Sequence, residues 1–473
     1  MDQNKENLEQ VSISAKLYED VVTPLVNLAK APRALWGVNL SYFFEGFVYF
    51  GMLGYLTMYF SDYIRLGDYW SSVMVSVLTW GITLSMFFLG GISDKVGVRK
   101  AILGALLLML FGRIIMSIAP YSGLPTGMAS GMHLMAMGGI VFIVLGYGMY
   151  QPAAYSAVKN FTSAKNSAMG YAMLYALMNL GGWLPSFFSP IRKSVGIRGA
   201  YWVFSGFTLL TVILTFFILS RYVVQKATEN AENERKKEEE ENNKDKESTP
   251  KIDDEPVAEI KKKGIINWFK EHPLADGKFA FFIFALIPVQ TLFAYNWLII
   301  PKYVERAYQN SWIGQNFEVA TNFNPLLIFI LVPIVTALTM KKKIYNMMVW
   351  GTLVMAAPSF LLATGANAFT LGGYLIIMTI GEAMWQPRFL QYAAEIAPPG
   401  KTGAYMGVAQ FPWFLTKFVT GLYAGWFLKE YCPDTGKLNT EIMWLVFGVI
   451  AMVTPVLLIV ARPWLGKDFK ESN

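Results

Sequence analysis

Long apolar runs separated by short polar segments dominate the pattern along the chain. A helix that crosses a bilayer needs about 20 predominantly apolar residues, and runs of this length recur throughout the sequence. The breaks between them are short and rich in charge or glycine, so each run is predicted to be one membrane-spanning helix. The pattern predicts twelve spans, at about residues 34–61, 69–92, 100–120, 131–158, 167–189, 199–221, 277–301, 317–340, 345–364, 369–393, 403–428 and 441–461.

A segment of different character separates the sixth and seventh predicted spans. Residues 222–263 include the run Glu234–Glu241 and three consecutive lysines. Such a stretch cannot bury a core, so it is expected to be mostly disordered or loosely helical. Residues 264–278 mix apolar and charged side chains and could lie on the membrane surface as an amphipathic helix. The expected organisation is a segment 1–33, a six-helix bundle 34–221, a charged linker 222–276, a second six-helix bundle 277–461 and a tail 462–473.

Composition supports an all-α, polytopic membrane protein. The 473 residues are 54% hydrophobic and only 15% charged, whereas soluble domains carry about 25% charged residues. The single cysteine, Cys432, excludes internal disulfides, and two histidines leave little for a histidine-based metal site. Since no catalytic triad or metal cluster is apparent, we expect no enzyme activity and no cofactor. The net charge of +7 is attributed to loops near an anionic leaflet rather than to nucleic-acid binding.

Lys and Arg positions predict the orientation. With the N-terminus inside, most of the cations between spans fall on the inner side, including the linker and Lys341–Lys343. Arg192, Lys193 and Arg198 are an exception on the outer side. We therefore expect a monomeric protein of the cytoplasmic (inner) cell membrane with both termini in the cytoplasm.

The loop Gly90–Lys100 between the second and third spans is the most informative local motif. It has the spacing Gly-x-x-x-Asp-Lys-x-Gly followed by two cations, which predicts a tight charged hairpin. It resembles the corresponding loop of major facilitator superfamily carriers, and the resemblance implies solute transport by rocking of two bundles. The loop would then act as a conformational latch, although a solvated turn that follows the positive-inside rule remains an alternative. The predicted latch residues are Gly90, Asp94, Lys95, Gly97 and Arg99.

Short fragments recur between the two halves. Met149–Pro152 in span 4 has the same pattern as Met384–Pro387 in span 10, with a glutamine before each proline. About eighteen residues later, a Met-Gly pair follows in each half. These echoes predict that the halves are parallel repeats related by an axis along the membrane normal.

Several charged residues fall inside predicted spans, and Arg388, late in span 10, lies nearer the inner surface than the other four. Glu45 and Glu382 lie near mid-bilayer, where a carboxylate is costly and usually marks a transport pathway or proton site. We predict that both take part in proton coupling. Arg113 and Lys417 are intramembrane cations that could hold a negative group of the solute. The alternative is that these cations pair with the two glutamates and lock helices together.

Uncharged polar residues complete the predicted site. Tyr49, Gln151 and Gln386 are expected to line a cavity, and Gln290 lies within the seventh span. Such residues also bond helices to one another in membranes, so a purely structural role remains open. The predicted solute-binding set is Tyr49, Arg113, Gln151, Gln290, Gln386 and Lys417.

Within the superfamily, the chain resembles the proton-coupled oligopeptide transporters. Glu45–Met52 is similar to their span 1 signature, and Gly146–Pro152 to their span 4 motif. Three departures stand out: Tyr42 replaces a glutamate, Gly46 replaces an arginine and Gln151 replaces a lysine. The resemblance implies proton-coupled uptake of small peptides or similar amphoteric solutes. Alternatives are a carrier for an organic anion, sugar derivative or drug and, from another class, a membrane enzyme or non-transporting sensor.

Overall fold

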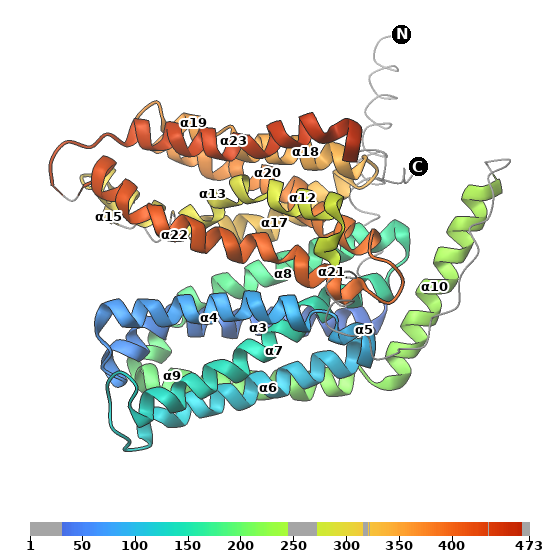
Figure 1. Ribbon diagram of the computed structural model, residues 1–473, viewed down its shortest axis with the longest axis horizontal. Helices are drawn as coiled ribbons and strands as arrows, with labels where there is room; N and C mark the ends of the chain where they lie inside the picture. The colour runs from blue at the N-terminus through green and yellow to red at the C-terminus, as the bar shows by residue number, and fades with distance from the viewer. Residues whose placement is uncertain (1–30, 245–271, 316–319, 321, 434, 466–473) are drawn as a thin grey trace, which may run out of the picture.

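The computed structural model describes residues 31–244, 272–315, 320, 322–433 and 435–465 of the chain. Helices provide the regular structure of these residues, and no strand occurs among them. They form two bundles that lie side by side, and the helices of both run along the long axis of the molecule (Figure 1). The prediction of an all-α membrane protein with two helical bundles is therefore confirmed, and the structure is consistent with six helices in each.

Six long helices form the N-terminal bundle. The first, α3, continues into a π-helical turn at Tyr59–Tyr63. Glycines permit its close crossing with α8, because a Cβ on Gly46 would lie 2.9 Å from Met178 Sδ and one on Gly181 would lie 2.5 Å from Phe43 O. An arginine at position 46 therefore has no room. The helices are α3 (Arg33–Met58), α4 (Gly67–Leu89), α6 (Val98–Ile118), α7 (Gly131–Phe161), α8 (Ala164–Trp183) and α9 (Ser189–Ile218).

The C-terminal bundle also has six spans, three of which are interrupted. Breaks occur at Leu286, Ala357–Pro358 and Gln410, each at or within two residues of a proline, which disfavours helical geometry in the residue before it. The helices are α12 (Gly277–Ala285) with α13 (Ile287–Leu298), α17 (Phe323–Thr339), α18 (Ile344–Ala356) with α19 (Ser359–Leu362), α20 (Ala368–Glu395), α21 (Thr402–Ala409) with α22 (Phe411–Tyr431), and α23 (Thr440–Leu465). Two short helices, α14 (Ile300–Ala307) and α15 (Trp312–Gln315), follow α13.

The spans differ in length and hydropathy, and several of the shorter or less apolar ones lie at the interface between the bundles. Seven, namely α6, α7, α9, α12–α13, α18–α19, α20 and α23, are long and apolar enough by themselves to cross a membrane. The others, α3, α4, α8, α17 and α21–α22, are shorter or less apolar. Several of these pair across the bundle interface, as α8 does with α17 and α4 with α22, where one face of each helix meets protein rather than lipid.

The linker begins with a continuous helix rather than disordered chain. Helix α10 (Arg221–Lys244) packs on α3 and α7 through its buried Ala227 and Ala231. These two contacts give it an apolar edge that its high charge conceals in the sequence. The predicted amphipathic segment at residues 264–278 lies largely outside the described residues, as does nearly all of segment 1–33.

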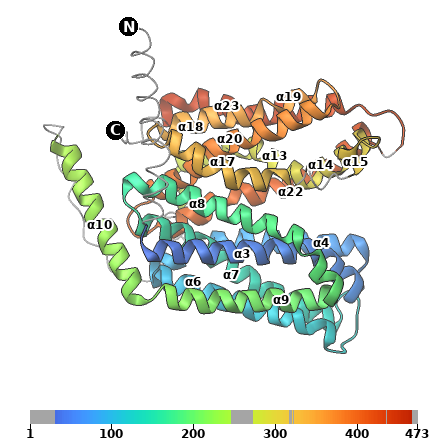
Figure 2. The same ribbon diagram turned by 180° about the vertical axis from the view of Figure 1, so that it is seen from behind.

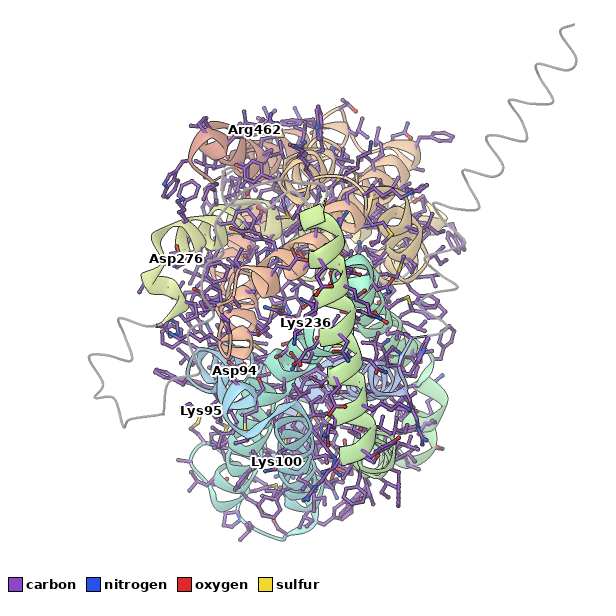
Figure 3. The ribbon with its side chains drawn as sticks, turned by 90° about the vertical axis from the view of Figure 1, so that its right-hand side faces the viewer. Asp94, Lys95, Lys100, Lys236, Asp276 and Arg462 are labelled. Atoms are coloured by element: carbon purple, nitrogen blue, oxygen red, sulfur yellow. The ribbon has the colours of Figure 1, made fainter. Side chains whose placement is uncertain are left out.

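One end of the molecule carries α10, α21 and the short helix α5 (Ile92–Val96), and we call it the linker end (Figures 1 and 2). Helix α3 begins and α23 ends there. Viewed onto this end, α10 crosses the face of the molecule from the N-terminal bundle toward the C-terminal one (Figure 3). Gly97 joins α5 to α6 with a φ of 83°, a conformation that favours glycine.

Candidate transport site

A cavity at mid-depth has walls from both bundles. Its volume is about 80 Å³, room for several water molecules, since one needs about 10–15 Å³ of such volume. Helices α3, α7 and α8 form one wall, and α13, α17, α20 and α22 form the other. The lining residues are Tyr42, Phe50, Gln151, Tyr155, Tyr175, Met178, Asn179, Gly182, Phe293, Asn296, Asn324, Pro325, Glu382, Gln386, Gln410 and Trp413.

The two repeated glutamines both line this cavity, one from each bundle. Gln151 belongs to α7 and Gln386 to α20. The Gln151 amide donates from Nε2 to the Tyr42 hydroxyl at 3.1 Å. The Oε1 atoms of both glutamines are buried and accept no hydrogen bond from a described residue. Because a buried acceptor gains when it receives a hydrogen bond, these oxygens are suited to contact a polar solute.

Glu382 is the one lining residue, among those described, with a carboxyl or cationic side chain. It is 1% exposed. The Tyr175 hydroxyl of α8 donates to Oε1 at 2.5 Å, and Asn324 Nδ2 of α17 donates to Oε2 at 2.8 Å. Glu382 thus receives one neutral donor from each bundle, and no ion pair to it occurs in the part of the chain that the structure describes.

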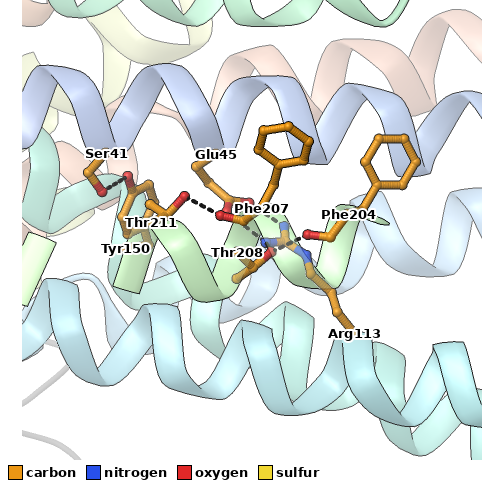
Figure 4. Close-up of polar contacts among 8 residues, drawn as sticks. All are labelled: Ser41, Glu45, Arg113, Tyr150, Phe204, Phe207, Thr208 and Thr211. Carbon is orange, nitrogen blue, oxygen red and sulfur yellow. Dashed lines mark hydrogen bonds and ion pairs between the residues drawn. The ribbon is translucent and has the colours of Figure 1, made fainter. Parts of the chain in front are cut away.

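Glu45 lies away from the cavity lining, inside the N-terminal bundle (Figure 4). It forms a two-pronged ion pair with Arg113 of α6, and both side chains are 1% exposed. Arg113 Nη1 donates to Glu45 Oε2 at 2.7 Å and to Thr208 Oγ1 of α9 at 2.7 Å, while Nη2 donates to Glu45 Oε1. The pair therefore joins α3, α6 and α9. This geometry matches the helix-locking alternative for these two residues, and their transport roles stay predictions.

Three other predicted binding residues also lie outside the lining. Tyr49 packs against Tyr147 with ring centres 4.8 Å apart. Gln290 of α13 is buried at 1% exposure. Lys417 Nζ lies 3.4 Å from the ring centre of Trp413, which does line the cavity. The structure thus brings Gln151, Gln386 and Glu382 together and leaves the remaining predicted residues behind or beside the cavity wall.

Asp94 contacts the opposite bundle at the linker end. Its Oδ1 accepts a hydrogen bond from the Gly403 backbone N–H at 2.8 Å, and Oδ2 accepts from Ala404 N–H at 3.1 Å. These groups belong to the first turn of α21, where the helix dipole favours negative charge. Burial raises the pKa of the Asp94 carboxyl above its ordinary value of 3.8, and the two N–H donors partly offset this rise.

The other predicted latch residues differ in whether they contact the opposite bundle. Gly90 ends α4 where backbones approach across the interface: a Cβ there would lie 3.1 Å from both Gly403 O and Gly407 Cα. Arg99 instead stays within its own bundle, donating through Nε to the carbonyl of Leu219 at the end of α9. Lys95 is exposed. Among the predicted latch residues, contact between the bundles therefore comes from Asp94 and Gly90.

Lys159, which the sequence does not single out, makes a second contact between the bundles. From the end of α7, its Nζ donates to the carbonyls of Ala394 at 2.7 Å and Ala397 at 3.5 Å, at the end of α20. A cation suits the C-terminal end of a helix. Asp94 and Lys159 thus hold the two helix ends that flank the α20–α21 turn, each with the charge that suits it. The hydrogen bonds between the described parts of the two bundles gather at the linker end and at mid-depth, so the linker end is closed.

The linker helix is attached beside this contact. Arg235 of α10 donates through Nε to Thr162 O at 3.0 Å and through Nη2 to Lys159 O at 3.1 Å.

Among the cavity residues, Gln410 and Trp413 are also absent from the sequence-based set. An amide within an apolar run is the signal that could have identified Gln410. Trp413 gives no such signal, because the chain has 14 tryptophans.

Comparisons with known proteins agree with this architecture. The sequence profile of the Major Facilitator Superfamily matches residues 35–421. Among solved structures, the transporter FucP in its outward conformation has a TM-score of 0.64 at 12% identity, covering 89% of this chain and 97% of its own. The proton:xylose symporter XylE has a TM-score of 0.61 at 13% identity, covering 91% and 96%.

A peptide transporter bound to alafosfalin is also similar, with a TM-score of 0.55 at 16% identity, covering 93% of this chain and 96% of its own. At these identities the likeness shows the fold alone. Comparison with curated protein sequences gives no significant match. Because the family profile spans most of the chain and the two-bundle fold agrees with it, the chain belongs to the Major Facilitator Superfamily.

Proposed function

We propose that this chain is a secondary active carrier in which an inward proton gradient drives uptake of a small solute by alternating access. The observation that supports this most directly is Glu382. A buried carboxyl that has no cationic partner among the described residues, placed between two bundles that must move apart, is suited to bind and release a proton during the cycle.

Protonation of Glu382 would act on the contact between the bundles. An ionised carboxylate accepts hydrogen bonds at both oxygens, whereas a protonated one carries an O–H donor on one of them. The bonds from Tyr175 and Asn324 would therefore weaken together when the proton arrives. Since Tyr175 belongs to the N-terminal bundle and Glu382 to the C-terminal bundle, proton binding would lower the cost of separating them.

The linker end would form the inner gate. Asp94 and Lys159 hold it closed in the described conformation, and both contacts must break for a solute to leave on that side. Cations gather at this end, so we propose that it faces the cytoplasm together with both termini. A monomer in the inner cell membrane, as the sequence predicts, is part of the same proposal.

Peptide cargo, the leading prediction from the sequence, makes a specific demand on this chain. A peptide carboxylate needs a cation with suitable geometry. Arg113 is occupied by Glu45, so Lys417, which contacts the lining residue Trp413, would have to serve. Carriage of a peptide should therefore fail in Lys417→Gln.

Reconstituted vesicles test the coupling mechanism. We expect Glu382→Gln to abolish gradient-driven accumulation while solute exchange without a gradient persists. Glu305→Gln is the matched control, because Glu305 is exposed and pairs with its neighbour Lys302. Normal accumulation by Glu382→Gln would contradict the proposal. Glu45→Gln distinguishes the two readings of that residue: retained exchange without accumulation would assign it to coupling, and loss of folding would assign it to structure.

A second measurement needs no solute. Spin-label distances across the linker end should change with pH in the wild type, because protonation of Glu382 biases the two bundles. The same distances should be insensitive to pH in Glu382→Gln. An unchanged pH response in this variant would contradict the assignment even if the transported solute were unknown.

A further inference from the structure

We infer that the solute is an uncharged, polyhydroxylated molecule of the monosaccharide or polyol class. This inference rests on the carrier function proposed above and specifies its cargo. It follows from the side chains that line the cavity, from the unpartnered atoms among them and from the charges that the lining does not contain.

Amides supply most of the hydrogen-bonding groups of the lining. They come from both bundles: Gln151, Asn179, Asn296, Asn324, Gln386 and Gln410. An amide offers donors and acceptors side by side, and a hydroxyl is likewise both donor and acceptor. A solute with several hydroxyls can therefore satisfy many such groups at once, whichever way each amide is turned.

Three buried atoms of these amides have no hydrogen-bond partner among the described residues. Gln151 Oε1 and Gln386 Oε1 are acceptors, and Gln410 Nε2 is a donor. All three side chains are at least nine-tenths buried, with exposures of 5–6%. A solute that matches two acceptors and a donor must itself both donate and accept, which hydroxyl groups do and carboxylates or ammonium groups do not.

Aromatic rings supply the apolar part of the lining. Tyr42, Phe50, Tyr155, Phe293 and Trp413 are distributed over both walls. Binding sites for small molecules commonly combine such rings with a few placed polar groups. A sugar ring has the matching character, since its hydroxyls lie around an apolar C–H surface.

The charge of the lining excludes strongly charged cargo in this conformation. Burial of an ion without a partner is costly, and no lining residue is a cation. A carboxylate or phosphate would therefore bind unpaired unless Lys417 left the Trp413 ring. An ammonium group would require Glu382 to be ionised, yet the proposed cycle loads a proton on that carboxyl. An uncharged solute avoids both conflicts, because protonated Glu382 leaves the lining neutral.

Equilibrium binding to the purified full-length protein tests this inference without any gradient. The probes are D-glucose, D-xylose, L-fucose, mannitol and myo-inositol, compared with the dipeptide Ala-Ala, lactate and tetraethylammonium. A ligand that binds the folded state raises the melting temperature. We expect at least one neutral sugar or polyol to raise it saturably and the charged probes to have no effect.

Variants then locate the binding site. Gln151→Ala and Gln386→Ala should each weaken sugar binding by about tenfold, corresponding to one hydrogen bond of about 1.4 kcal/mol. Gln225→Ala is the matched control, because Gln225 is exposed on α10 and bonds to Glu229. Variants that retain a cooperative melting transition are folded and report on binding alone.

The outcomes separate this inference from the carrier proposal. Binding of Ala-Ala, lactate or tetraethylammonium but no sugar or polyol overturns the cargo assignment, as does the failure of every neutral probe at millimolar concentration. Sugar binding that is indifferent to Gln151 and Gln386 also overturns it. Sugar binding that depends on both glutamines, without proton-driven accumulation in vesicles, would leave the cargo assignment standing and refute proton coupling instead.

Discussion

Removal of the Asp94 charge should open the linker end. In Asp94→Asn the side chain keeps one acceptor oxygen, so one of the two bonds to Gly403 and Ala404 is lost together with the negative charge at the start of α21. A hydrogen bond to a charged group contributes about 1.5–3 kcal/mol net, and the dipole term adds about 0.3–1 kcal/mol. Relief of the buried charge offsets part of this loss.

The expected net change is about 1.5–3 kcal/mol against the closed state. At 1.4 kcal/mol per tenfold, the ratio of closed to open linker ends should fall by a factor of about 10 to 150. Spin labels at Lys100 and Arg462, which are exposed on opposite bundles at this end (Figure 3), report the change as a longer distance in lipid nanodiscs. The labels require a Cys432→Ser background, since Cys432 is the sole cysteine.

Asp276→Asn provides a closely matched control. Asp276 also accepts two backbone N–H groups at a helix start, from Lys278 at 3.0 Å and Phe279 at 3.2 Å, but within its own bundle. It should lower the melting temperature without lengthening the distance. If Asp94→Asn leaves the distance distribution unchanged, or if both variants shift it equally, the reasoning about a latch between the bundles is refuted.

Three further variants test other contacts. Arg113→Met should destabilise the fold by about 3–5 kcal/mol because it leaves Glu45 buried without its cation. Adding Glu45→Leu should raise the melting temperature again, and an unchanged melting temperature would count against a structural pair. Gly403→Val should lengthen the same spin-label distance, since a Cβ there would lie 2.2 Å from Ser93 Oγ and 2.6 Å from Gly90 O; an unchanged distance would show that the interface can absorb the side chain. Arg235→Ala removes both hydrogen bonds from α10 to the α7–α8 corner, so hydrogen exchange in α10 should accelerate, and unchanged protection would mean that the apolar contacts alone hold it.

The fold follows from the sequence more completely than the site does. Spans are set by the length and hydropathy of each run, so the predicted ranges fall close to the helices, as 131–158 does to α7 (Gly131–Phe161). Gln151 and Gln386, which the repeat predicts to be equivalent, both line the cavity between the bundles. Helix α10 was harder to foresee, since its high charge masks the two alanines that pack on the bundle.

Contacts between distant segments could not be read from the sequence. Glu45 and Arg113 are 68 residues apart, and only the packing of α9 on both α3 and α6 decides that they meet inside one bundle rather than in the cavity. Lys159 binds backbone carbonyls, which every residue has, so its partner leaves no trace in the sequence. Asp94, in contrast, could be singled out from the sequence because it lies in a loop with a recognisable glycine spacing.

Helix α20 connects the proposed proton site to the gate. Glu382 meets Tyr175 at mid-depth, and Ala394, twelve residues further along the same helix and so about 18 Å away at 1.5 Å per residue, accepts from Lys159. Between them, Gln391 Nε2 donates to Ser167 Oγ of α8 at 3.3 Å. Packed interfaces switch between discrete arrangements rather than deforming continuously. Weakening of the Tyr175–Glu382 bond on protonation therefore weakens the interface that α20 forms with the N-terminal bundle, and this interface also includes the linker-end contacts. A proton bound at mid-depth can thus favour gate opening without any contact to the gate itself.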